Sequence, residues 1–177
     1  MSLTSASFFA FLLVTLVLYY TTPKCQKYVL LVASFVFFLK ASPIGLGWML
    51  LLMAYILLVT YGGAIYIEKR NGWQGTVATV LTIAGLAATL FLLKYAFNMG
   101  ELFASLLTLD VNISWLNFVP IMGLSYFILS AIGYVMDVRW QMYSAERNIA
   151  TVALFIYYFP QVVSGPVTRF SQMREQL

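Results

Sequence analysis

Long uncharged stretches, separated by short groups of charged residues, dominate the pattern of this sequence. Six stretches contain no Asp, Glu, Lys or Arg, and they cover residues 1–23, 28–39, 41–67, 71–93, 111–136 and 148–168. A helix needs about 20 apolar residues to cross a hydrocarbon core of about 30 Å. The first, third, fourth and fifth stretches reach that length, so the pattern predicts membrane-spanning helices there.

The second and sixth stretches need separate arguments. Residues 28–39 are too few for a full crossing, but Lys27 and Lys40 at the two ends can reach the membrane surface and extend the segment. Residues 148–168 are numerous enough, but Pro160 interrupts them. The pattern therefore predicts an all-α, polytopic transmembrane protein. We expect about five to six membrane segments with a broken last helix, in one domain that covers residues 1–177.

Composition supports a membrane protein and excludes several other classes. Hydrophobic residues make up 62% of the chain and charged residues only 9%, whereas about a quarter of an ordinary soluble domain is charged. These charges are too few to cover a water-facing surface, and the 17% of aromatic residues argues against disorder. Cys25 is the only cysteine and histidine is absent, so we expect no metal site and no imidazole base.

The basic residues indicate an orientation in the membrane. Lys24 and Lys27 follow the first uncharged stretch instead of preceding it, so the positive-inside rule favours an N-terminus outside the membrane. Alternate connections then place Lys24, Lys27, Lys69, Arg70, Arg139 and Arg147 inside, and Lys40, Lys94, Arg169 and Arg174 outside. These charges are spread thinly along the chain, so a nucleic-acid partner is not expected.

Hydroxyl groups form a stripe on the fifth predicted helix. Tyr126, Ser130 and Tyr134 follow one another at intervals of four residues, and Asp137 lies close to the same face. One interpretation is that these groups make hydrogen bonds that hold helices together. The other is that they line an internal polar passage, because ionisable groups in membrane segments tend to face wet interiors.

The last uncharged stretch contains the strongest anomaly. A helix from Ile149 to Phe159 would rise only about 16 Å, roughly half of a hydrocarbon core. Pro160 then removes a backbone donor, and Gly165-Pro166 interrupts the path again. Non-helical backbone at membrane depth is tolerated only where protein buries it or where it lines a water-filled cavity. We therefore expect residues 159–166 to border an enclosed wet cavity; a simple proline kink in a longer helix is the alternative.

Several of these residues together match a known family. They are Pro120, Gly123-Leu124-Ser125-Tyr126, Tyr134, Asp137, Arg147-Asn148, Phe159-Pro160-Gln161, Gly165-Pro166 and Arg169. In this arrangement the chain resembles the membrane-bound O-acyltransferase (MBOAT) family, in the bacterial branch of alginate O-acetylases and the teichoic acid D-alanyl transfer protein. The resemblance covers essentially all 177 residues but only the N-terminal part of a family member. We therefore expect a fragment, or a relative that has lost its catalytic histidine.

The resemblance implies a function for the whole protein. It implies transfer of an acyl group, acetyl in the first instance, from a thioester donor on the cytoplasmic side to a hydroxyl of an envelope polysaccharide or similar polymer. The thioester donor would be of the acyl-carrier or acyl-CoA type, with no cofactor bound to the protein. It also implies a multi-pass protein of the cytoplasmic or inner membrane. The family's catalytic histidine lies downstream, so the 177-residue chain alone is expected to be inactive.

Six residues are candidates for lining the passage, and none of them is expected to be catalytic. They are Tyr126, Asp137, Gln161, Gly165, Pro166 and Arg169. Our hypothesis is that Asp137 and Arg169 close or orient the passage. Two other functions stay open at this point. A transporter or channel fragment would also contain broken helices, although no internal repeat is visible. A non-catalytic membrane scaffold would need no histidine.

Overall fold

The computed structural model describes residues 6–23, 25–41, 46–70, 72–94, 123–164 and 170–174. All regular secondary structure in these ranges is helical: α1 (Ala6–Thr21), α2 (Gln26–Ala41), α3 (Leu46–Glu68), α4 (Trp73–Lys94), α6 (Leu124–Arg139), α7 (Ile149–Tyr157), α8 (Phe159–Ser164) and α9 (Phe170–Arg174). The predicted all-α class is confirmed for these residues. Within them, α3 and α4 are long and apolar enough to cross a membrane.

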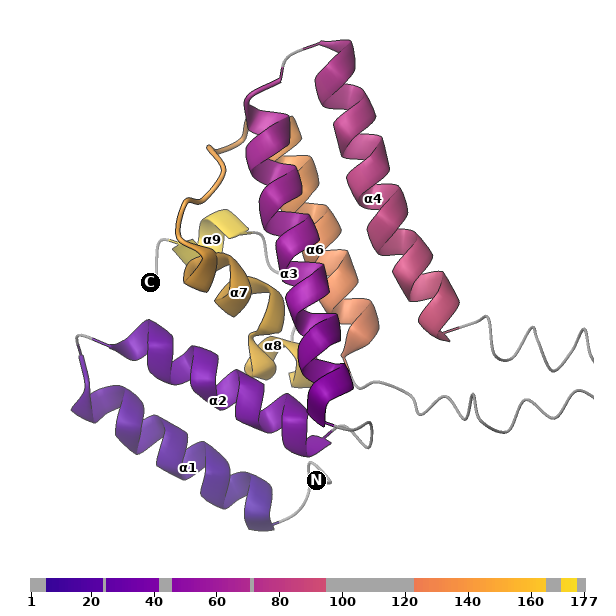
Figure 1. Ribbon diagram of the computed structural model, residues 1–177. Helices are drawn as coiled ribbons and strands as arrows, with labels where there is room; N and C mark the ends of the chain where they lie inside the picture. The colour runs from indigo at the N-terminus through magenta and orange to yellow at the C-terminus, as the bar shows by residue number, and fades with distance from the viewer. Residues whose placement is uncertain are drawn as a thin grey trace, which may run out of the picture.

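The longest helices form the upright part of the molecule. α3 and α4 run antiparallel and are joined by a short connection at one end, and α6 packs against both (Figure 1). The 23 residues of α3 span about 34 Å at 1.5 Å per residue, which exceeds a hydrocarbon core of about 30 Å. Gly63 allows α3 and α4 to approach closely, because a Cβ there would lie 2.7 Å from Cγ2 of Thr82.

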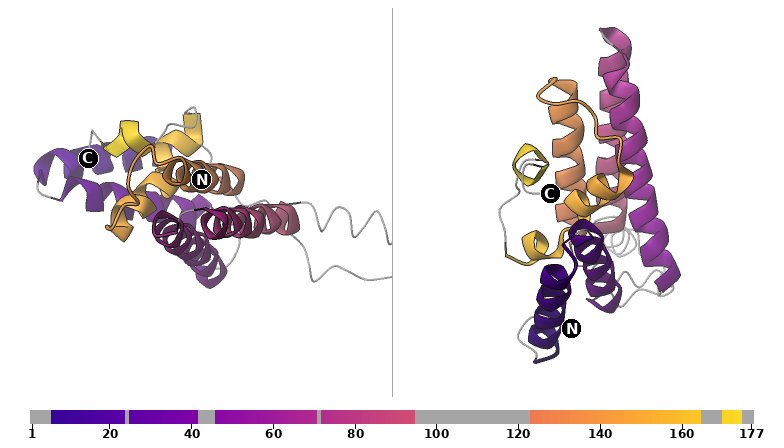
Figure 2. Two further views of the ribbon diagram at one scale, coloured as in Figure 1. Left: turned by 90° about the horizontal axis from the view of Figure 1, so that it is seen from above. Right: turned by 90° about the vertical axis from the view of Figure 1, so that its left-hand side faces the viewer.

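The first two helices form a separate layer. α1 and α2 are antiparallel and pack against each other, and they run obliquely to α3 and α6 (Figures 1 and 2). α2 also contacts α7 and α8. Each of these two helices has 16 residues, so each is about 24 Å long. The predicted short second segment is therefore helical, and it extends beyond residues 28–39 at both ends.

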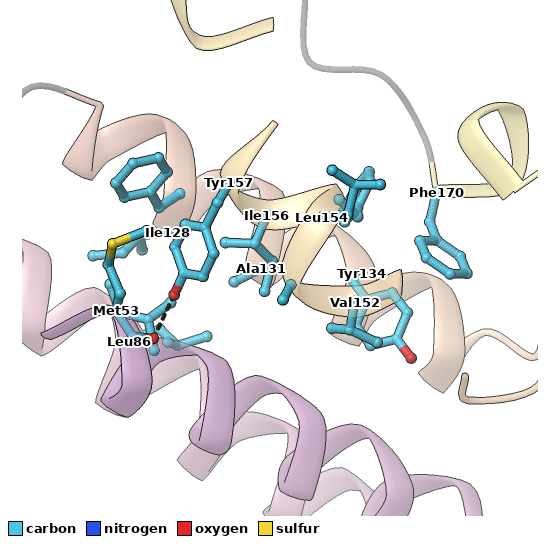
Figure 3. Close-up of a cluster of buried hydrophobic side chains, with 14 of the residues drawn as sticks. Met53, Leu86, Ile128, Ala131, Tyr134, Val152, Leu154, Ile156, Tyr157 and Phe170 are labelled. Atoms are coloured by element: carbon cyan, nitrogen blue, oxygen red, sulfur yellow. Dashed lines mark hydrogen bonds between the residues drawn. The ribbon is translucent and has the colours of Figure 1, made fainter. Parts of the chain in front are cut away.

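The core of the protein surrounds α7. This helix contacts α2, α3 and α6, and residues 152–157 are all buried. Their side chains pack against Ile128, Ala131 and Tyr134 of α6, and Met53 of α3 and Phe170 of α9 lie in the same cluster (Figure 3). Helices with one apolar face lie on a surface, whereas a helix that is apolar all round is buried. α7 is mostly apolar, and protein buries its residues 152–157, whereas Ile149 at its start is 41% exposed.

Candidate functional site

The predicted interruption of the last apolar stretch is present in the structure. α7 ends at Tyr157, Tyr158 is extended (φ −64°, ψ 102°), and α8 begins at Phe159. The break therefore lies two residues before Pro160, which occupies the first turn of α8, where a missing backbone N–H leaves no bond unmade. With nine residues, α7 rises only about 14 Å. This length is about half the thickness of a hydrocarbon core of about 30 Å.

Side chains and backbone groups from α2 and α3 support this break. The backbone N–H of Phe159 donates a hydrogen bond to Oγ of Ser34 at 3.3 Å, and the Ser34 hydroxyl donates to the carbonyl of Leu30 at 2.8 Å. On the other side, the hydroxyl of Tyr157 donates to the carbonyl of Met53 (Figure 3). Ser34 and Tyr157 are both fully buried. The backbone N–H of Phe159 and the buried hydroxyl of Tyr157 are thus both paired inside the protein, as burial requires.

Sequence reasoning did not identify Ser34 or Tyr157 as supports of the break. The available signal was weak: Ser34 is the only hydroxyl-bearing residue between residues 29 and 41. A single polar residue in an apolar segment often bonds to a neighbouring helix. Its partner here is 125 residues away in the sequence, and no local pattern indicates that pairing.

Two of the predicted site residues are brought together next to the break. The hydroxyl of Tyr126, near the start of α6, donates to Oε1 of Gln161 on α8 at 2.8 Å. Gly123, which precedes α6, has a left-handed backbone (φ 85°). A Cβ at Gly123 would lie 2.8 Å from Cγ1 of Val162 on α8. The start of α6 therefore fits closely against α8, and glycine is required at the contact.

Asp137 lies away from that pair. Eleven residues separate it from Tyr126 on the same helix, which corresponds to about 16 Å along the helix axis. Its Oδ2 accepts a hydrogen bond from the Tyr143 hydroxyl at 3.2 Å. Between these ends, Ser130 is buried and the hydroxyl of Tyr134 accepts the backbone N–H of Glu146 at 2.9 Å. Tyr126 and Tyr134 both bond to protein groups, which fits the interpretation that the stripe ties elements together.

The segment between α6 and α7 is held by a polar network at this end of α6. Glu68, at the end of α3, accepts the backbone N–H of Ala145 at 3.1 Å and forms an ion pair of 2.6 Å with Arg147. Burial raises the pKa of the Tyr143 hydroxyl, and the neighbouring negative charge of Asp137 raises it further. Tyr143 therefore stays protonated and keeps donating its hydrogen bond. At the same end of α6, Arg139 contacts α4 by donating to Oγ1 of Thr76 at 2.8 Å.

A groove of about 510 Å³ runs beside the break. Tyr158, Phe159 and Pro160 form one wall, and residues of α1 form most of the other. Its lining is mainly apolar, and its hydroxyl-bearing residues are Thr15, Tyr19, Tyr20 and Tyr158. On this side the break borders an open apolar groove, which differs from the enclosed wet cavity expected from the sequence.

The remaining candidate residues cannot be placed. Gly165, Pro166 and Arg169 lie outside the described residues. The hypothesis that Asp137 and Arg169 close a passage therefore stays a prediction, as does the second interruption at Gly165-Pro166. Within the described ranges, no three Asp, Glu or Cys side chains gather into a possible metal site.

Comparison with known proteins identifies relatives of one kind. The chain is 28% identical to the probable alginate O-acetylase AlgI of Azotobacter vinelandii over 174 residues, which cover 95% of the chain and 34% of that protein. The probable alginate O-acetylases AlgI of Pseudomonas syringae pv. tomato and Pseudomonas aeruginosa are 28% and 29% identical, again over 95% of the chain and over 33% and 32% of their own lengths.

The matches cover nearly the whole chain but only part of each relative. No protein-family model matches the chain, and no solved structure matches it significantly. The chain spans about a third of the length of the curated relatives. The resemblance seen in the sequence motifs is confirmed: over 95% of its length, this chain is homologous to part of the alginate O-acetylase AlgI, of the membrane-bound O-acyltransferase family.

Proposed function

We propose that the chain forms part of a membrane-embedded O-acyltransferase. The observation that carries this proposal is the homology to alginate O-acetylases over 95% of the chain. The reaction moves an acyl group, in the first instance acetyl, to a hydroxyl of an envelope polysaccharide, for which alginate is the example given by the relatives' names. The donor is a thioester presented on the cytoplasmic side.

The residues of this chain have only a limited role in the chemistry of this transfer. A base removes the proton of the acceptor hydroxyl, the oxygen attacks the thioester carbonyl, and the thiolate leaves. The chain contains no histidine, and the family resemblance places the catalytic base downstream of the part that this chain matches. The proposed role of this part is to shape the passage and hold it in place. We therefore expect no acyl transfer by the 177-residue chain on its own.

The proposal includes a location for the break. Two apolar helices are long enough to cross a membrane, whereas α7, with nine residues, is too short to do so. A helix that ends inside a bundle leaves non-helical backbone there. At membrane depth such backbone must be buried in protein or line a water-filled cavity. The Tyr126–Gln161 hydrogen bond lies beside that place. We propose that this pair, together with Gly165, Pro166 and Arg169, borders the passage, and that Asp137 orients its other end. We also propose that the protein lies in the cytoplasmic or inner membrane with its N-terminus outside, as the positions of Lys24 and Lys27 favour.

A chimera tests the proposed function. This chain replaces the aligned region of the probable alginate O-acetylase of Pseudomonas aeruginosa, to which it is 29% identical. The acetyl-ester content of the alginate is then measured by NMR, and the membrane level of the chimera by immunoblot. Acetylated alginate is the expected result. A chimera that accumulates in the membrane at the parental level but yields unacetylated alginate would contradict the proposal.

Single substitutions in the same chimera test the pair beside the break. Tyr126→Phe removes only the hydroxyl that bonds to Gln161, and a net hydrogen-bond contribution of about 0.5–1.5 kcal/mol corresponds to an activity about two- to tenfold lower. Gln172→Leu is the control, because Gln172 is exposed on α9 and away from this contact. Equal acetylation by the two variants would exclude a role for the pair.

A further inference from the structure

A second groove, of about 690 Å³, lies between α3 and α4 on the outside of the bundle. Gly62 and Gly63 of α3 both line the groove, but only Gly62 leaves open space there. A Cβ at Gly62 would meet no atom within 4 Å, whereas Gly63 is packed against Thr82. Val77 and Leu81 of α4 line the same groove and are 37% and 67% exposed. The part of the groove away from the α3–α4 connection is therefore mainly apolar and open to the surroundings.

The end of this groove next to the α3–α4 connection is lined by charged and aromatic side chains. Arg70 lies there, with Nη1 donating to Oε1 of Gln74 at 3.0 Å and its guanidinium carbon 5.7 Å from the ring centroid of Tyr66. Tyr66 and Trp73 also line the groove and are 51% and 82% exposed. Aromatic side chains of this kind settle at the membrane–water boundary. The order along the groove is thus a cation, exposed aromatic rings and an apolar trough.

The local charge favours an anion at this end. α4 contains no acidic residue, and Glu68, the only acidic residue of α3, is bound to Arg147. Lys69 adjoins Arg70 in the sequence. α4 also begins at Trp73, and the N-terminal end of a helix carries a partial positive charge. Figure 1 shows the connection between α3 and α4 at the end of the bundle, where α4 is the outermost helix.

We propose that the groove between α3 and α4 binds an anionic phospholipid, with one acyl chain along Gly62, Val77 and Leu81 and the phosphate at Arg70. The apolar trough matches an acyl chain, the aromatic rings match the glycerol region, and the guanidinium matches the phosphate. This inference depends on the membrane location proposed above. It does not depend on acyl transfer, and its test uses no acyl donor.

Trp73 supplies the probe for the experiment. Trp48, Trp115 and Trp140 are replaced by Phe, which leaves Trp73 as the only tryptophan. The full chain is reconstituted into bilayers of phosphatidylcholine that contain a small fraction of brominated phosphatidylglycerol or brominated phosphatidylcholine. Bromine quenches tryptophan fluorescence on contact. We expect about fivefold preference for phosphatidylglycerol, since one basic residue near an anionic headgroup contributes about that factor. Equal quenching by the two lipids would overturn the proposal.

Two pairs of variants separate the headgroup contact from the chain contact. Arg70→Gln should bring the preference close to one, and the control Lys94→Gln, at the other end of α4, should leave it unchanged. Gly62→Leu should lower quenching by both lipids, whereas Gly133→Leu should not, because Gly133 is equally open but lies on α6. Unchanged quenching in either Arg70→Gln or Gly62→Leu would refute the corresponding contact. Failure of the chain to enter bilayers would instead contradict its membrane location.

Discussion

Replacement of Ser34 by alanine is the most informative single change at the helix break. Ser34 is 0% exposed, and its Oγ accepts the N–H of Phe159 at 3.3 Å. Alanine removes the acceptor and leaves that N–H buried without a partner from α2. An unpaired buried donor costs about 1–3 kcal/mol. This is the full desolvation penalty, and it exceeds the net value of an ordinary hydrogen bond.

Hydrogen exchange at the Phe159 amide measures this cost locally. A loss of about 1–3 kcal/mol should speed exchange by about 5- to 150-fold if the amide exchanges through local opening. Mass spectrometry with electron-transfer fragmentation resolves this amide in protein reconstituted in nanodiscs. Ser130→Ala is the matched control, because Ser130 is also a buried helical serine but does not bond to the break. Unchanged exchange at Phe159 in Ser34→Ala would refute the claim that Ser34 stabilises the break.

Three further predictions concern stability, measured as the free energy of unfolding in mixed micelles. Gly123→Ala should destabilise the protein by about 1–3 kcal/mol because of its positive φ, whereas Gly133→Ala should be neutral or stabilising; equal effects would contradict this. Glu68→Gln should cost about 0.5–1 kcal/mol, since its ion pair is partly exposed, and the difference from Lys69→Gln should shrink in 1 M salt. The pKa of Tyr143 is raised above its usual 10.0 in the folded protein, so its contribution is present below pH 10 and is lost above it. Tyr143→Phe should therefore lose less stability than the parent as the pH rises beyond 10; parallel curves would exclude this.

The sequence predicted those features that depend on composition and local chemistry. Absence of charge located α3 and α4, because a helix that crosses a membrane must be apolar over its whole length. Pro160 indicated an interruption of the last apolar stretch, and the structure contains it at Tyr158. The break lies two residues before Pro160 for a simple reason. Proline fits well in the first turn of a helix, so the chain breaks before Pro160 and begins α8 with it.

Other features could not be read from local patterns. The pairing of Ser34 with Phe159 and of Tyr157 with Met53 depends on how α2, α3 and α7 are arranged in space. The stripe on α6 was correctly placed on one face, but Tyr126 and Tyr134 bond to different elements. Spacing along a helix shows which side chains point the same way. It does not show which elements cover them.

The burial of α7 connects the sequence, the fold and the proposed function. A nine-residue helix that lay in lipid would expose unpaired backbone groups at its ends, each of which would cost several kcal/mol. Here protein buries residues 152–157 of the helix, so the proposed end at membrane depth would be tolerated. Such an end provides a fixed position for polar groups inside the bundle. The proposed passage depends on that position.

A photo-crosslinking experiment tests the enclosure of α7 most directly. p-Azidophenylalanine replaces Phe155 of α7, which is 3% exposed, or Phe9 of α1, which is 64% exposed, in the full chain within phospholipid bilayers. After irradiation, mass spectrometry identifies the products. We predict that the probe at position 155 links to peptides of this chain near Tyr134 and Phe170, whose rings lie 6.4 and 5.3 Å away, and that the probe at position 9 forms lipid adducts. Lipid adducts at position 155 as abundant as those at position 9 would contradict the enclosure.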